Sequence, residues 1–131
     1  MIYFATEIGR LNWKYQMPDH SLLIANAVRM AAGGSYPVEV KAPFGVQMSY
    51  FRQPGRLIVH LVNGLADRPR VDVVPVADVS VGVEFGAGPP PASAKALALG
   101  RDLKTITVEG LAWVTLPRLD TWEALVFELG D

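Results

Sequence analysis

The fold of this chain is decided by the stretch FGVQMSYFRQPGRLIVHLVN, residues 44–63. Its first half alternates apolar with other residues, as in a strand with one buried face: Phe44, Val46, Met48 and Tyr50. Its second half, residues 56–63, predicts another strong strand. Between them, Pro54 and Gly55 suit the second and third positions of a type II turn, because glycine tolerates the positive φ required there. The stretch therefore predicts a hairpin.

Strand patterns recur on both sides of this hairpin, with glycine or proline between them. They cover residues 36–41, 79–85, 94–99, 103–108, 111–116 and 122–129, and residues 71–74 of the connection 64–75 could pair briefly. About seven to eight short strands at this spacing are typical of a sandwich with Greek-key crossings. We therefore predict a mainly β fold, a β-sandwich of antiparallel strands.

The opening residues follow a different pattern. Residues 2–5 are a short apolar run of buried-strand type, and residues 6–17 predict a polar and aromatic loop. Asp19 can cap a helix over about residues 20–32, which Gly33 and Gly34 would end. Apolar residues cover more than half of this helix, so it requires cover on more than one side. We expect residues 1–34 to be the last strand and helix of an α/β domain whose earlier part is absent, and residues 35–131 to be the sandwich.

Composition excludes several classes of function. The 12 basic and 13 acidic residues give a net charge of −1 and are scattered without runs, so neither nucleic acid nor an anionic membrane is an expected partner. The chain has no cysteine, which excludes disulfides and thiolate metal sites. It also has no apolar run long enough to span a bilayer and no signal-peptide pattern, so we expect a soluble protein. The cytoplasm is favoured, but an internal Met1 would leave the export of a longer parent protein open.

Two regions resemble a known family. The first contains IGR at 8–10, WKY at 13–15, PDH at 18–20 and LLIANAVR at 22–29, and the second is QPGRLIVHLVN at 53–63. Together they resemble the C-terminal region of glycoside hydrolases related to the β-galactosidases that carry a trimerisation domain. The resemblance implies a catalytic (β/α)8 barrel, then a domain similar to class I glutamine amidotransferases, then a small β-sandwich. Residues 1–34 would close the amidotransferase-like domain. Met30 departs from the pattern, since such sequences tend to have tryptophan there.

The resemblance also implies where catalysis takes place. The family's catalytic acid and nucleophile lie in the barrel, and no residue of this chain corresponds to either. We therefore expect a non-catalytic accessory or assembly region that needs no cofactor and mediates domain or subunit contacts. Its partner would be the missing N-terminal catalytic domain or another copy of the chain, giving a homo-oligomer. The alternative is a free-standing carbohydrate-binding module, which requires at least two aromatic residues that are exposed and coplanar on one sheet face or loop edge.

The candidate ligand or interface residues lie near the N-terminus: Glu7, Arg10, Trp13, Tyr15 and His20. Trp13 and Tyr15 fall in the predicted irregular loop, where burying them needs a neighbouring domain or subunit. A sugar stacked on these rings is the competing hypothesis.

Other chemistry-bearing residues are better explained by ordinary structural roles. Trp113 and Trp122 are predicted to lie in the core or at a sheet edge. The carboxylates of Glu84, Glu109, Glu123 and Glu128 are predicted to be solvated, so they form no catalytic pair. His20 and His60 have no third ligand at a supporting spacing, and Asp67, Asp72 and Asp78 lack the spacing of a calcium loop, so we predict no metal site.

Overall fold

The computed structural model describes residues 2–15, 17–33, 36–65 and 73–130. The chain divides into two compact units, residues 1–36 and residues 37–131. We call the first the helical unit and the second the sandwich, and each is described by itself.

The helical unit contains two helices, α1 (Ile8–Tyr15) and α2 (Pro18–Ala31), where one was expected. The predicted loop is wrong over α1, whose leucine, arginine and lysine favour helix and outweigh Gly9. The predicted strand over residues 2–5 is also wrong, since the described residues there lie in no strand. A strand needs a neighbour for its backbone hydrogen bonds, and the described part of this unit offers none.

The helix predicted over about residues 20–32 is confirmed as α2, although its start differs. It begins at Pro18. Proline suits the first turn of a helix, because a backbone N–H there would have no intrahelical acceptor. Asp19 lies inside the first turn and does not cap the helix, because Met17 is the N-cap and makes no side-chain cap bond. The Ser21 hydroxyl donates to Asn12 Oδ1 at 2.8 Å and joins the two helices. No helix among the described residues is long and apolar enough to cross a membrane.

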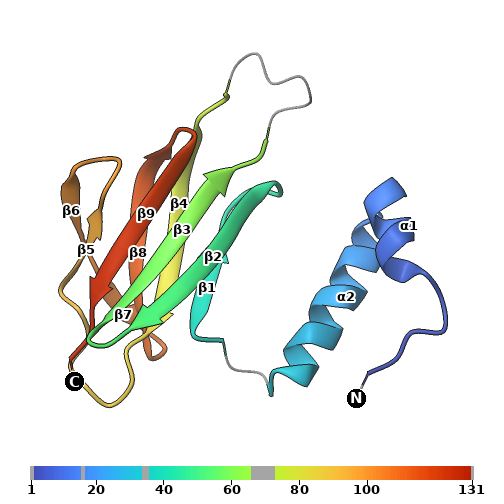
Figure 1. Ribbon diagram of the computed structural model, residues 1–131, viewed down its shortest axis with the longest axis horizontal. Helices are drawn as coiled ribbons and strands as arrows, with labels where there is room; N and C mark the ends of the chain where they lie inside the picture. Colours follow the sequence, from blue (N-terminus) through green and yellow to red (C-terminus); the bar gives the residue numbers. More distant parts are fainter. Residues whose placement is uncertain (1, 16, 34–35, 66–72, 131) are drawn as a thin grey trace. The chain divides into compact units, whose positions relative to one another are not determined.

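The sandwich confirms the predicted fold class. Its described strands are β1 (Val38–Lys41), β2 (Val46–Gln53), β3 (Arg56–Asn63), β4 (Val76–Glu84), β5 (Ser93–Ala96), β6 (Arg101–Lys104), β7 (Ile106–Val108), β8 (Leu111–Leu119) and β9 (Trp122–Glu128). They form a four-stranded sheet in the order β1-β4-β8-β7 and a five-stranded sheet in the order β2-β3-β9-β5-β6 (Figure 1). Neighbouring strands in both sheets pair antiparallel.

The hairpin that decides the fold is confirmed as β2 and β3. The two strands pair from Val46 opposite Asn63 to Gln53 opposite Arg56, which leaves Pro54 and Gly55 as the turn. Gly55 has a φ of 71°, as the third position of a type II turn requires.

One predicted strand divides between the sheets. Residues 103–108 were expected to be continuous, but Thr105 separates β6, in the five-stranded sheet, from β7, in the four-stranded sheet. The Thr105 N–H donates to the carbonyl of Ala92 at 3.1 Å, and its hydroxyl donates to the carbonyl of Pro91. These bonds hold the chain where it crosses. Of the brief strand predicted over 71–74, residues 73–74 lie in no strand and 71–72 lie outside the described residues.

The core lies between the two sheets and follows the period of two. Every second residue is buried along β3 and β9, and the same spacing holds from Val79 to Val83 in β4 and from Ala112 to Leu116 in β8; Phe127 is the largest of these side chains. Because inward residues alternate with outward ones, the same register fixes which side chains lie on the two outer faces.

Candidate functional site

The five predicted site residues all lie in the helical unit, and the structure brings only some of them together. Arg10 Nη2 lies 2.5 Å from Glu7 Oε2, and Arg10 Nε donates to the same oxygen at 2.6 Å. Both side chains are about two-thirds exposed, at 68% and 66%, so the pair contributes little stability. Tyr15 lies beside its neighbour Lys14, whose Nζ is 5.1 Å from the ring centroid. The role of the five predicted residues as a ligand or interface site stays a prediction.

Trp13 and His20 stand apart from that ion pair. The Trp13 side chain is 84% exposed on α1. His20 Nδ1 is buried and has no hydrogen-bond partner among the described residues. The predicted aromatic loop is therefore a helical surface on which Trp13 is open to a partner.

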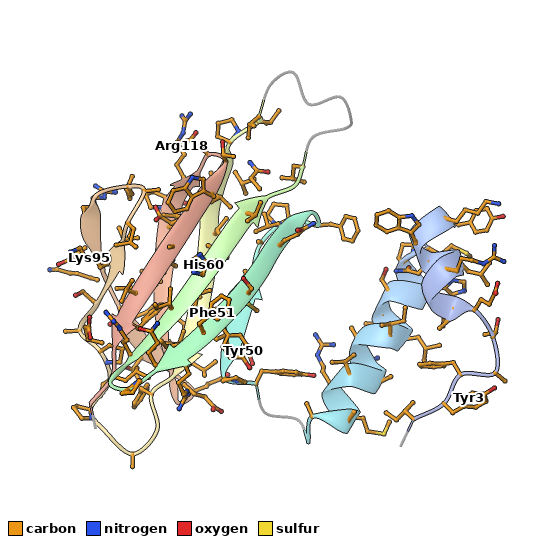
Figure 2. All side chains as sticks on the ribbon, in the orientation of Figure 1. Tyr3, Tyr50, Phe51, His60, Lys95 and Arg118 are labelled. Atoms are coloured by element: carbon orange, nitrogen blue, oxygen red, sulfur yellow. The ribbon has the colours of Figure 1, made fainter. Side chains whose placement is uncertain are left out.

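The helical unit exposes most of its large apolar side chains. Ile8 is the one buried hydrophobic residue in the described part of this unit, and α2 has no buried residue over its 14 residues. The exposed ones are Ile2, Tyr3, Trp13, Tyr15, Met17, Leu22, Leu23, Val28 and Met30. Figure 2 labels Tyr3 among them. We call this set the helical apolar surface.

The outer face of the five-stranded sheet exposes a second group of apolar side chains. Phe51 lies opposite Ile58, and Ile58 lies opposite Val126, so these three form a row across β2, β3 and β9. The Phe51 ring meets the His60 imidazole edge to face, with 5.5 Å between centroids and 88° between planes (Figure 2). His60 therefore packs against an aromatic ring.

Trp122 lies on this same outer face, opposite Val62 in the register. Its side chain is 52% exposed and that of Phe51 is 56% exposed. The prediction that Trp122 lies in the core or at an edge is wrong, because Leu125 and Phe127 take the inward positions of β9 and β9 is an interior strand. Phe51 and Trp122 are thus two exposed aromatic residues on one sheet face.

Trp113 has a packing role on the opposite sheet. It is half-buried on the outer side of β8, across from Gly82, and Lys41 Nζ lies 4.4 Å from its ring centroid. A Cβ at Gly82 would lie 2.6 Å from the ring atom Cε2, so glycine allows the indole to lie against the strand. The core or edge position predicted for Trp113 is therefore wrong, since β8 is also an interior strand.

Glu123 differs most from its prediction. It is 2% exposed, and its carboxylate accepts three backbone hydrogen bonds, from Ala98 at 2.7 Å, Leu99 at 2.9 Å and Ala124 at 2.8 Å. The carboxylate therefore fixes the β5–β6 turn. The signal that could have found it is the phase of the strand, since Glu123 shares the inward face with Leu125 and Phe127.

Asn63 is a structural residue that the sequence interpretation missed. It is 2% exposed, and its amide nitrogen donates to the carbonyls of Val74 and Asp120, both at 2.8 Å. Its amide oxygen accepts from the Leu65 N–H at 3.1 Å. Asn63 thus ties the end of β3 to the β8–β9 turn.

Most of the other acidic residues singled out in the sequence are spread over the part of the sandwich that the structure describes. Glu109 and Glu128 are exposed, as predicted, and Glu84 is half-buried. Asp78 is exposed with a φ of 55°, whereas Asp67 and Asp72 lie outside the described residues. Within the described ranges, no group of three His, Cys, Asp or Glu side chains could hold a metal ion.

The sequence matches no family model and no curated protein. The structure is similar to that of alpha-L-fucosidase isoenzyme 2 from Paenibacillus thiaminolyticus, with a TM-score of 0.77 and 16% sequence identity. The match covers 98% of this chain and 21% of the fucosidase chain, so this chain spans about a fifth of that protein's length. At this identity the likeness shows a shared fold.

Proposed function

We propose that this chain is a non-catalytic accessory region of a larger glycoside hydrolase, in which the helical apolar surface contacts another domain or another copy of the chain. The observation that carries the proposal is the exposure of this surface. The similarity to one-fifth of a fucosidase supports the enzymatic context, because the same fold occurs there within a much longer polypeptide.

The energetics of the helical unit support a partner. Burying one leucine, valine or methionine side chain contributes roughly 1.5 to 3 kcal/mol. Among the described residues of this unit, only Ile8 is buried and contributes this full amount. Units of fewer than about 40 residues rarely fold alone without disulfides, metals or association, and this chain has no cysteine. Association through Leu22, Leu23 and Met30 would supply the missing burial.

The finer assignments belong to this proposal. The relation to β-galactosidases with a trimerisation domain, and the origin of residues 1–34 in an amidotransferase-like domain, rest on the sequence resemblance. Both carboxylate oxygens of Glu123 already accept backbone hydrogen bonds. This structural role of Glu123 is consistent with a part of the parent protein that has no catalytic activity.

A second candidate function is a free-standing carbohydrate-binding module. The observation that favours it is the exposure of Phe51 and Trp122 on one sheet face. Sugar binding by a chain that remains monomeric would favour this candidate over the first.

The proposal is tested by charging the helical surface. Leu23 and Met30 are seven residues apart and lie on one face of α2, so Leu23→Glu with Met30→Glu places two carboxylates on that face. We expect wild-type chain to self-associate and the double variant to be monomeric by light scattering, with unchanged unfolding of the sandwich. Ile106→Glu is the control, because Ile106 is 66% exposed on β7, outside the helical unit. Association that survives the double substitution would contradict the proposal.

A further inference from the structure

A cavity of about 220 Å³ opens at one end of the sandwich. Arg118, Asp120 and Trp122 line it from the β8–β9 turn and its flanking strand ends, and Ala98 and Leu99 line it from the β5–β6 turn. Figure 2 labels Arg118 at this end of the molecule. The cavity is smaller than the roughly 300 to 1,000 Å³ of pockets for drug-sized ligands, so it suits a single ring.

Both walls of this cavity are held by buried polar side chains. Glu123 accepts the N–H groups of Ala98 and Leu99 at 2.7 and 2.9 Å and fixes one wall. Asn63 donates to the carbonyl of Asp120 at 2.8 Å and fixes the other. Among the described residues, Asn63 and Glu123 are the buried polar or charged ones, so the interior polarity of the sandwich is concentrated behind this cavity. Such support pre-organises a binding site.

The open side of the cavity presents an aromatic ring beside a charged pair. Trp122 is 52% exposed. Arg118 Nε and Nη2 both lie 2.8 Å from Asp120 Oδ1, and within the described residues no hydrogen bond engages Oδ2. The two side chains of this ion pair are 63% and 62% exposed, and their charges cancel each other. Hydrogen bonding to Asp120 raises the pKa of Arg118.

This chemistry fits a hydroxyl-rich ring without net charge. A sugar ring has an apolar C–H face that can stack on an indole, and its hydroxyls both donate and accept hydrogen bonds. The carboxylate oxygen of Asp120 can accept from one hydroxyl while the guanidinium of Arg118 donates to the next. Glu123 also lines the cavity, but backbone N–H groups occupy both of its carboxylate oxygens, so Arg118 and Asp120 are the charged groups left to contact a ligand there.

We propose that the cavity between the β5–β6 and β8–β9 turns binds a neutral sugar ring, stacked on Trp122 and hydrogen-bonded by Arg118 and Asp120. This site rests on the second candidate function, carbohydrate binding, and locates it at Trp122. It does not depend on self-association, so it and the accessory role can fail separately.

The test is a titration of the isotope-labelled full chain followed by nuclear magnetic resonance. The probes are L-fucose, D-galactose and D-xylose, each added to about 50 mM, which nearly fills a site with a Kd of a few millimolar. We expect at least one sugar to give saturable shifts at the amides of Ala98, Leu99 and Thr121 and at the Trp122 indole N–H. Trp122→Ala should weaken that binding by at least about tenfold.

Two further variants keep the result interpretable. Trp122→Phe retains an aromatic face and should bind more tightly than Trp122→Ala, provided that both variants unfold cooperatively. Trp13→Ala removes an even more exposed indole from the helical unit and should leave binding unchanged. The proposal is overturned if no sugar saturates, if the shifts survive Trp122→Ala, or if adenosine, which also stacks on indoles, binds in place of the sugars.

Discussion

At the scale of single residues, Glu123 links the core of the sandwich to its surface. A buried carboxylate is costly unless its oxygens are hydrogen-bonded, and here three backbone N–H groups satisfy them. Those bonds also define the β5–β6 turn, which forms one wall of the cavity. Stability and the proposed binding site therefore depend on the same side chain.

Replacing Glu123 by alanine should destabilise the chain by about 2 to 3 kcal/mol, because the N–H groups of Ala98, Leu99 and Ala124 lose a charged acceptor. Glu123→Gln keeps the size and one carbonyl oxygen, so its cost should lie between those of alanine and wild type. The free energy of unfolding in urea measures both. Glu128→Gln, at the exposed end of β9, is the matched control and should stay within about 0.5 kcal/mol of wild type. Equal stability of Glu123→Ala and wild type would disprove this role.

Site residues were harder to predict than strands. Glu123 and Asn63 are polar residues at inward positions, and residue type alone predicts exposure for both. The phase of β9, set by Leu125 and Phe127, does place Glu123 inside and Trp122 outside. The partners of Glu123 in the β5–β6 turn lie about 25 residues away in the chain, so no local pattern reveals them.

At the scale of elements, β4 and β8 show how glycine and tryptophan are matched across a pair of strands. Gly82 lies opposite Trp113, and the missing side chain leaves room for the indole, with Lys41 beside it. The ring protects the outer side of the four-stranded sheet from water.

Gly82→Ala should force the Trp113 ring away from the strand, since the new Cβ would lie 2.6 Å from Cε2. We expect a loss of about 1 to 3 kcal/mol in the free energy of unfolding, as for other overpacked sites. In a Trp113→Val background the same substitution should cost much less, because the clashing ring is gone. A double-mutant cycle measures this coupling. Identical costs in the two backgrounds would show that the ring does not limit the site.

Elements with a strong period were predictable, whereas their assignment to sheets was not. The hairpin of β2 and β3 follows from alternation and a proline-glycine turn, both of which are local. The division of residues 103–108 at Thr105 depends on bonds to Pro91 and Ala92. Helix α1 was missed because eight residues are too few for a clear period of 3.6.

At the scale of the whole molecule, the two units differ in how many of their apolar side chains are buried. The sandwich has a continuous core between two sheets, whereas the described part of the helical unit buries only Ile8 among its hydrophobic residues. The sandwich should therefore fold by itself, and the helical unit should depend on a partner. This difference is the physical basis for the accessory role proposed above.

The most direct test of this account compares the solution mass of the full chain with that of residues 37–131, measured by light scattering over a range of concentrations. We predict that the full chain exceeds its monomer mass of 14.2 kDa and that the shorter chain is a folded monomer with unchanged stability of the sandwich. If both chains are monomers of equal stability, the helical apolar surface is not an assembly element and the account is contradicted.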